Sequence, residues 1–344
     1  MKPEKAVTIY DIASHLNISA ATVSRGLQDH PAISRETKKR ILAAAKKLGY
    51  RTNTFAKSLR TRKTNTIGVI VHRLNSYFIS TVLAGMESTA NKEGYNLIIS
   101  QSLERFEKEQ QAVLTMYNKQ VDGLLISLAA DTPSIEHLEP FFSRKIPVVF
   151  FDRAPGVNLH TSILVDNFRA AYKATTHLLE QGCKKLMHLA GNTTSNLYAE
   201  RLAGFKQALK DHHIRFSDKL LFESDLSEDA GLAAADYILS LKDRPDGVFV
   251  ANDNSAVHCM LRLQQAGMKI PEDIAFVGFN NDPITRVISP NLSSINYPGL
   301  TLGVTAIQTM LNHINGLATL ENTSSIVLRD ELIIRASSLR NKNL

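Results

Sequence analysis

From Thr66 onward, short apolar runs rich in β-branched and aromatic residues alternate with longer segments of helical periodicity. This alternation predicts parallel β-sheets whose strands are joined by right-handed helical crossovers. It extends over roughly 280 residues, enough for two doubly wound lobes with a ligand site at the carboxyl ends of the strands. The expected strands are Ile67–Val71, Asn96–Ser100, Gly123–Leu128, Pro147–Phe151, Leu186–Ala190, Gly247–Ala251 and Ile274–Phe279. The helices expected between them include Phe78–Glu93, Arg105–Lys119, Phe168–Gln181 and Asn254–Gln265.

The first fifty residues follow a different pattern, that of short capped helices. Thr8 followed by Asp11 resembles a capping box, with Asp in place of the usual Glu or Gln, and predicts a first helix over about residues 9–16. Ser19 is the expected N-cap of a second helix over about residues 20–27. Two short helices separated by a tight turn indicate a helix-turn-helix when a third helix covers their apolar side.

A third helix is expected from the N-cap Ser34 through Leu48, with Gly49 as its C-terminal stop. Its apolar stripe is predicted to comprise Ile33, Ile41, Leu42, Ala45 and Leu48. Periodicity alone leaves open an ordinary three-helix bundle without a ligand, so the choice between the two depends on charge.

The distribution of charge favours DNA. Residues 1–65 contain 14 Lys and Arg but only 4 Asp and Glu, whereas the remainder of the chain contains 26 basic and 29 acidic residues. All of the excess positive charge therefore lies in the first fifth of the chain. A basic block with the periodicity of a folded domain indicates contact with a polyanion.

In a helix-turn-helix, the N-terminal residues of the second helix face base edges in the major groove. Arg25 suits bidentate hydrogen bonds to guanine, and Ala20 or Ala21 suits the thymine methyl group. Thr22 and Ser24 suit phosphate and would set orientation. The DNA-contacting residues expected in this region are Thr8, Tyr10, Ser19, Ala20, Ala21, Thr22, Ser24 and Arg25.

Several stretches resemble the lactose/galactose-repressor (LacI/GalR) family of transcription regulators. They are V-T-I-Y-D-I-A from Val7, A-T-V-S-R from Ala21, L-G-Y at Leu48–Tyr50, A-K-S-L-R at Ala56–Arg60 and T-x-x-I-G-V-I from Thr64. The resemblance extends to about Arg335. It implies an all-α helix-turn-helix domain followed by an α/β, two-lobed, periplasmic-binding-protein-like domain with doubly wound parallel sheets. It also implies a sequence-specific repressor of carbohydrate-utilisation genes that a small-molecule effector controls.

Residues 51–65 are basic, lack acidic residues and would otherwise be interpreted as a solvated linker. The resemblance implies that this segment becomes helical on operator DNA and that a leucine of each hinge kinks the minor groove. Such apolar intercalation unstacks bases at a cost of a few kcal/mol, which the contacts of the bent DNA offset. By position the wedge is Leu59, with Asn53, Ala56 and Ser58 beside it. Thr52 departs from the proline that is frequent in the family.

The resemblance also predicts the domain limits. The helix-turn-helix domain is expected at residues 1–51, the hinge at 52–65 and the effector-binding and dimerisation domain at 66–344. Within the last, lobe 1 is expected at about 66–164 and 296–326, and lobe 2 at about 165–295 and 327–340. The chain would cross between the lobes near residues 163–166, 292–297 and 324–328.

Polar and aromatic residues follow several of the expected strands and suit a sugar-sized ligand. By position in the family, the expected effector contacts are Tyr77, Phe78, Asp152, Arg153, Arg201, Leu226, Asn252, Asn280 and Tyr297. Structural roles remain open for some of them. Tyr77 and Phe78 suit an interlobe core, Asp152–Arg153 suits an internal ion pair, and the neighbouring Asp253 suits a helix N-cap.

Three positions depart from sugar-responsive family members. Asn280 replaces a common Asp, Leu226 replaces the usual aromatic platform, and Tyr297 replaces a frequent Gln. A sugar or sugar derivative is the favoured effector, but Arg153 and Arg201 would also suit a phosphate or carboxylate.

The sequence disfavours other classes of protein. The chain contains none of the motifs G-x-G-x-x-G, G-x-x-x-x-G-K-[ST], H-E-x-x-H or G-x-S-x-G, so an enzyme is not expected, and neither is a cofactor or metal. A secreted sugar-binding protein shares the expected fold, but the chain starts without the apolar region of a signal peptide. An effector-dependent activator and a corepressor-dependent repressor both remain open.

Location and assembly follow from the same features. The chain is expected in the cytoplasm, and at the nucleoid when bound to a pseudo-palindromic operator. Cys183 and Cys259 are predicted to be buried, reduced thiols. Because no leucine heptads follow Arg335, a homodimer is expected rather than a tetramer.

Overall fold

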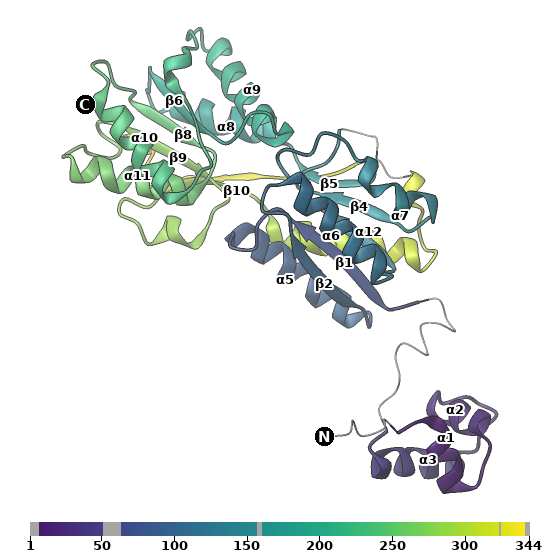
Figure 1. Ribbon diagram of the computed structural model, residues 1–344. Coiled ribbons are helices and arrows are strands. Elements are labelled where there is room, and N and C mark those ends of the chain that lie inside the picture. Colours follow the sequence, from purple (N-terminus) through teal and green to yellow (C-terminus); the bar gives the residue numbers. More distant parts are fainter. Residues whose placement is uncertain (1–6, 51–62, 157–159, 323–324, 341–344) are drawn as a thin grey trace. The chain divides into compact units, whose positions relative to one another are not determined.

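The computed structural model describes residues 7–50, 63–156, 160–322 and 325–340. The chain divides into two compact units, residues 1–64 and residues 65–344. Figure 1 shows the helices of the first unit and the two sheets of the second. Among the described residues, no helix has the length and apolar character needed to span a bilayer.

The first unit contains the three predicted helices, α1 (Ile9–Leu16), α2 (Ala20–Leu27) and α3 (Arg35–Leu48). The side chains of Ser19 and Ser34 accept hydrogen bonds from the backbone N–H groups of Thr22 and Thr37, which confirms both predicted N-caps. Gly49 ends α3 in the left-handed conformation, at φ 71°, as its position predicts.

The core of this unit is small and made of side chains from all three helices. Its buried members are Ile12, Ala13, Val23, Ile41, Ala44 and Ala45. Helices α2 and α3 approach closely at Gly26, where an added Cβ would lie 2.4 Å from Cδ1 of Ile41. The predicted stripe of α3 is wrong at Leu42, which is 55 % exposed. Ala44 is buried instead, because the face of α3 that meets α1 and α2 is centred on Ile41 and Ala45.

The second unit contains two six-stranded sheets. The sheet of lobe 1 has the order β11-β5-β4-β3-β1-β2, and the sheet of lobe 2 has the order β12-β10-β9-β8-β6-β7. Between the strands of these sheets, the pairings are parallel except that of β10 with β12, which is antiparallel. The first five strands of each lobe follow the doubly wound order 2-1-3-4-5, which confirms the predicted architecture.

Lobe 1 is built from two segments of the chain. Its elements are β1 (Thr66–Val71), α5 (Tyr77–Lys92), β2 (Asn96–Gln101), α6 (Phe106–Asn118), β3 (Gly123–Ile126), η1 (Glu136–Leu138), α7 (Glu139–Ser143), β4 (Val148–Phe151), β5 (Ser162–Val165), α12 (Gly299–Ile314), η4 (Leu320–Asn322) and β11 (Ser325–Leu328). Helices α5 and α12 pack on one face of the sheet and α6 and α7 on the other, so alternate residues of the central strands enter two different cores.

Lobe 2 repeats this plan. Its elements are α8 (Asn167–Glu180), β6 (Leu186–Ala190), α9 (Asn196–Asp211), η2 (Asp218–Leu220), β7 (Leu221–Glu223), α10 (Glu228–Ser240), β8 (Gly247–Val250), α11 (Asp253–Gln265), β9 (Ala275–Phe279), η3 (Pro283–Arg286), β10 (Ser293–Asn296) and β12 (Glu331–Ile333). Helices α8 and α9 cover one face, and α10 and α11 cover the other. The sequence pattern does not predict β7 and β12, three-residue strands that are only partly buried.

The chain passes between the lobes three times, after β5, after β10 and between β11 and β12. These crossings agree with the predicted positions near residues 163–166, 292–297 and 324–328, and Figure 1 shows β5 and β10 beside the junction. One buried apolar cluster continues across the junction, because it contains Phe78 of lobe 1, Phe279 of lobe 2 and Tyr297 between them. Both cysteines are buried and free, as predicted.

Candidate DNA-binding and effector sites

The predicted DNA-contacting residues of the first unit lie at the start of α1 and along α2, whose last turn carries Arg25. The backbone N–H and the hydroxyl of Thr8 each donate to Asp11 Oδ2 at 2.7 Å, and this pair sets the start of α1. Ser19 Oγ lies 2.8 Å from Thr22 Oγ1 and accepts the Thr22 N–H at 3.1 Å. Tyr10 is 72 % exposed.

Exposure differs among the predicted contacts on α2. Ala21 and Arg25 are exposed, whereas Thr22 and Ser24 are partly exposed. Ala20 packs against the core of the unit. Of the two alanines, Ala21 is therefore the better placed to contact a thymine methyl group. The predicted hinge contacts Asn53, Ala56, Ser58 and Leu59 lie outside the described residues.

At the junction of the two lobes, Asp152 is the centre of a buried polar cluster. Its Oδ1 accepts a hydrogen bond of 3.0 Å from the Tyr297 hydroxyl, and its Oδ2 accepts one of 3.4 Å from Ser127 Oγ. Burial raises the pKa of the Asp152 carboxyl, although Arg153, the Tyr297 hydroxyl and Arg201 oppose the shift. His72 Nδ1 lies 4.0 Å from Asp152 Oδ2, and because burial lowers the pKa of this imidazole well below 6.5, the contact is not an ion pair.

Arg201 comes from α9 in lobe 2 and is only 4 % exposed. Its guanidinium lies 3.4 Å from the centre of the Phe279 ring. Nε donates to Asn167 Oδ1 at 3.0 Å and Nη1 donates to the Ala251 carbonyl at 2.9 Å. Burial lowers the pKa of Arg201, although a guanidinium remains charged at neutral pH. The side chain is thus a buried cation held by neutral acceptors and an aromatic face.

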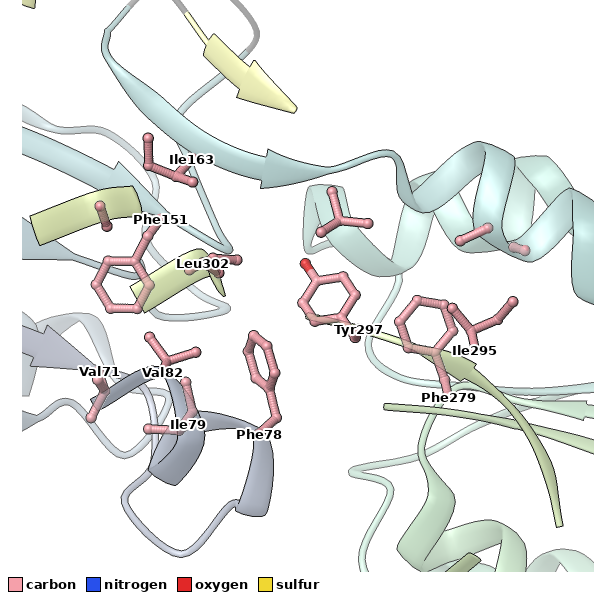
Figure 2. Packing of buried hydrophobic residues seen from close by; sticks show 14 of the residues in the cluster. Val71, Phe78, Ile79, Val82, Phe151, Ile163, Phe279, Ile295, Tyr297 and Leu302 are labelled. Atoms are coloured by element: carbon pink, nitrogen blue, oxygen red, sulfur yellow. The ribbon is translucent and has the colours of Figure 1, made fainter. Parts of the chain in front are cut away.

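Three aromatic rings connect the lobes beside these charges. The Phe78 and Tyr297 rings meet edge to face with centroids 4.7 Å apart, and the Tyr297 and Phe279 centroids are 5.4 Å apart. Figure 2 shows the Tyr297 ring between those of Phe78 and Phe279. Phe78 is 7 % exposed and belongs to the core, which agrees with the alternative prediction of an interlobe core residue. Tyr77 is 50 % exposed and does not belong to the core.

Arg153 forms an ion pair, but not with its neighbour in sequence. Its Nη1 and Nη2 donate to Oε2 and Oε1 of Glu104 at 2.6 and 3.1 Å. Burial alone would lower the pKa of Arg153, but Tyr198, Glu104 and Asp152 together raise it above its usual value. The alternative of an internal Asp152–Arg153 ion pair is therefore wrong, because the carboxylate that pairs with Arg153 is that of Glu104, from a different loop.

The other predicted effector residues lie at the ends of lobe 2 strands. Asn252 is the N-cap of α11, and its Oδ1 accepts the N–H groups of Asn254 and Ser255. The N-cap interpretation of Asp253 is therefore wrong. Asp253 is fully buried and accepts bonds from Ser294 Oγ at 2.7 Å and the Asp282 N–H at 2.8 Å.

Left-handed backbone conformations recur among the predicted effector residues. They occur at Asp152 with φ 61°, Leu226 with φ 59° and Asn280 with φ 111°. Such conformations are uncommon outside glycine and cluster at functional sites. Leu226 is buried, at 7 % exposed.

A cavity of about 330 Å³ adjoins the polar cluster and is lined by both lobes. Lobe 1 contributes Leu128–Ile135 except Asp131, together with Asp152–Gly156, and lobe 2 contributes Thr194–Leu197 and Glu200. Glu109 fixes the first of these segments, since its carboxylate accepts hydrogen bonds from the Ala129 N–H and the Thr132 hydroxyl. Across the described part of the chain, no cluster of three or more His, Cys, Asp or Glu side chains is arranged to hold a metal.

Comparison with known proteins agrees with both halves of this description. The family of bacterial regulatory proteins called lacI matches residues 8–53, and the periplasmic binding protein-like domain matches residues 175–338. Catabolite control protein A of Priestia megaterium is 30 % identical over 310 residues, which are 90 % of this chain and 93 % of that protein. This chain belongs to the LacI family.

Two further relatives also match over most of the length of both proteins. The HTH-type transcriptional repressor PurR of Vibrio vulnificus is 32 % identical over 89 % of this chain and 92 % of its own length. A crystal structure of the Lac repressor dimer bound to operator and the anti-inducer ONPF superposes with a TM-score of 0.89 at 26 % identity, covering 98 % of this chain and all of that one. As a LacI-family protein, the chain is a DNA-binding transcription regulator under the control of a small-molecule effector, and its relatives are regulators rather than enzymes.

Two residues of this LacI-family cleft, Tyr198 and Glu104, are not among those predicted from the sequence. Tyr198 lies between the two arginines, with its ring centre 5.8 Å from the Arg153 guanidinium and 5.5 Å from that of Arg201. Its ring rests on Gly191, where an added Cβ would come within 2.5 Å of it. The position of Tyr198 three residues before Arg201 is a usable signal, because such residues share one face of a helix. No local pattern indicates Glu104, because its partner is 49 positions away.

Proposed function

We propose that this LacI-family regulator represses carbohydrate-utilisation genes and that a sugar or sugar derivative, bound between the two lobes, controls its affinity for operator DNA. The observation that carries the proposal is the convergence of Asp152, Arg201 and Tyr297 beside a cavity that both lobes line. A carboxylate and a guanidinium hydrogen-bond to sugar hydroxyls, and aromatic rings pack on the apolar faces of a sugar.

The proposed effector contacts are those that the sequence predicts, namely Tyr77, Phe78, Asp152, Arg153, Arg201, Leu226, Asn252, Asn280 and Tyr297. Phe78, Asp152, Arg201 and Tyr297 are joined by direct contacts. An effector that inserts a hydroxyl between Asp152 and Tyr297 would replace their mutual hydrogen bond. Such an exchange would change the packing of the rings that connect the lobes.

We further propose that the chain acts as a homodimer on a pseudo-palindromic operator in the cytoplasm, at the nucleoid. The Lac repressor structure described above is a dimer bound to operator, which supports this assembly. Two copies of α2 would enter successive major grooves, and Arg25 would be the main polar contact to a base. The proposed domain limits are residues 1–51 for DNA binding, 52–65 for the hinge and 66–344 for effector binding and dimerisation.

Control of DNA affinity would pass through the three crossings between the lobes. Closure of the lobes around an effector would change the separation of the two hinges, and with it the fit of Leu59 and its neighbours to the minor groove. The coupling expected between effector and operator is about 1–3 kcal/mol, or roughly 5- to 150-fold in affinity.

The test requires the operator and the effector to be found separately. The full chain would select its operator from a random DNA library, and fluorescence anisotropy would then measure operator affinity with and without each member of a sugar panel. We expect a pseudo-palindromic site and at least one sugar that changes its affinity by the factor above. A chain that selects no sequence, or whose operator affinity ignores the whole panel, would contradict the proposal.

A further inference from the structure

The charges that face the cavity between the lobes are unfavourable for an anion. Among the described residues that line it, the charged ones are Asp152, Arg153 and Glu200. Two carboxylates therefore accompany a single guanidinium. Burial and the nearby Asp166 raise the pKa of Glu200, while Arg201 opposes the shift, so this side chain adds no positive charge in either protonation state.

The single guanidinium of this lining already has an anionic partner. Glu104 engages both terminal nitrogens of Arg153, in the parallel two-bond geometry by which arginine also binds phosphate or a ligand carboxylate. Arg153 is 7 % exposed. An anionic ligand would have to displace Glu104, whose side chain is 23 % exposed, from a guanidinium that is itself buried and paired through two hydrogen bonds.

The backbone holds Glu104 in place for this contact. Leu103 and Glu104 are consecutive residues in the left-handed region, at φ 52° and 61°. Few residues other than glycine adopt this conformation, and two in succession need compensating contacts. Glu104 Oε2 also accepts the N–H of Ala130, a cavity-lining residue, at 3.1 Å. The carboxylate is thus fixed from two sides.

Arg201 does not provide a substitute anion site. It does not line the cavity: its guanidinium carbon lies 3.4 Å from the centre of the Phe279 ring, and Nε and Nη1 donate to Asn167 Oδ1 and the Ala251 carbonyl. An anion that approached Arg201 from the cavity would also approach Asp152 and Glu200. Among the described residues that line the cavity, the one cationic group is therefore already paired, while Arg201, which has no anionic partner, lies outside the lining.

We propose that Glu104 is a specificity-determining residue, which occupies Arg153 in advance and so restricts the effector to uncharged polyhydroxylated molecules, excluding phosphorylated and carboxylated ones. The proposal rests on the function proposed above, since it assumes that the effector binds in this cleft. It settles the choice that Arg153 and Arg201 leave open in the sequence, between a neutral sugar and an anionic derivative.

The first test uses inorganic phosphate as the probe, so the natural effector need not be known. Isothermal titration of the full chain would compare the wild type, E104Q, the double variant E104Q/R153A and the matched control E107Q. Glu107 has a side chain 65 % exposed, pairs with Arg105 and does not line the cavity. We expect E104Q to bind phosphate at least about tenfold more tightly than the wild type, because its Arg153 fork is released. E107Q should behave as the wild type, and E104Q/R153A should lose the gain.

Three results would overturn the proposal: a wild type that binds phosphate as tightly as E104Q, a gain that survives the loss of Arg153, or an equal gain in E107Q. A second arm needs only the wild type and decides the matter if E104Q does not fold. Neutral sugars and their phosphate esters would be compared in pairs by the rise in Tm. The neutral member should stabilise more in every pair that binds, and a preference for any ester would refute the proposal. Operator affinity, measured in the same samples, reports separately on the proposed function.

Discussion

In the helix-turn-helix unit, the residues proposed to read DNA lie on two adjacent short helices, and most of them are exposed. In the effector cleft, the corresponding residues come from segments as far apart as Phe78 and Tyr297, and most are buried. The two regions also differ in the size of the hydrophobic core that holds their residues in place. Six small or medium apolar side chains form the buried core of the first unit, whereas the sensor unit is built around three larger clusters.

This difference separates the two functions energetically. An exposed side chain on a capped helix contributes to binding and little to folding, so it is free to change with the operator. A buried cleft residue contributes to both, because its hydrogen bonds also hold two lobes together. Substitutions at the effector site are therefore expected to alter stability as well as response, while those on the DNA-reading surface should alter binding alone.

The largest difference between operator binding and effector binding is expected for Ile41→Ala, in the small core of the first unit. Deletion of a buried Ile side chain costs about 2–5 kcal/mol, comparable to the whole stability of a small domain. We expect loss of operator binding with effector binding retained, as read by anisotropy and by calorimetry on the full chain. Leu42→Ala is the matched control, since Leu42 is 55 % exposed and the cost should stay within about 0.5 kcal/mol. Retained operator binding in Ile41→Ala would mean that the unit has support beyond the core described.

Arg201→Ala should lower both the stability of the chain and its response to effector. It leaves Asn167 and the Ala251 carbonyl without their charged donor, at a cost of about 2–4 kcal/mol in unfolding free energy. The response of operator affinity to effector should be lost in the same variant. Lys206→Ala on the same helix, whose ammonium group contacts the Phe216 ring, serves as the control. A variant that is destabilised but still responds would remove Arg201 from the effector site.

The buried carboxyl of Asp282 should make the sensor unit sensitive to pH. Burial raises the pKa of Asp282 from 3.8 to about 6, although a hydrogen bond from Asn280 opposes the shift. Between these values the folded chain holds a proton that the unfolded chain has released, so stability should fall as pH rises from about 4 to about 6. The expected fall is on the order of 1–3 kcal/mol.

Asp282→Asn removes this titration and should flatten the profile, leaving the variant more stable than the wild type at pH 7. Urea unfolding at several pH values measures both curves. The exposed Asp229→Asn is the control and should keep the profile of the wild type. An unchanged slope in Asp282→Asn would assign the pH dependence elsewhere, with the neighbouring Asp253 as the first candidate.

The smallest structural effect is expected for Arg25→Ala on the DNA-reading surface. Operator affinity should fall by about 1–3 kcal/mol, and preference should relax at one base position. Thermal unfolding should be unchanged, because Arg25 is exposed. Binding to a set of operator variants, each changed at one position, measures the effect. An equal loss on every sequence would instead indicate a phosphate contact.

Local signals in the sequence were sufficient for the three helices of the first unit and for seven strands of the second, namely β1–β4, β6, β8 and β9. The capped helices around Ser19 and Ser34 follow from contacts within a few residues, and the alternation of strands and helices follows from burial on both faces of a parallel sheet. The family resemblance located the candidate effector residues one by one. Local periodicity failed at Leu42 because helix packing, rather than apolar character alone, selects the buried face.

Only the tertiary structure decided how the effector residues are paired. The ion pair of Arg153 with Glu104, the hydrogen bond from the Tyr297 hydroxyl to Asp152 and the contact of the Arg201 guanidinium with the Phe279 ring all join distant segments. The first two depend on loop residues in the left-handed conformation, Glu104 and Asp152, and the third on the packing of α9 against the end of β9, none of which a short sequence pattern specifies. Sequence thus determined the class of this protein and its fold, whereas the charge left available to a ligand was decided by contacts between residues far apart in the chain.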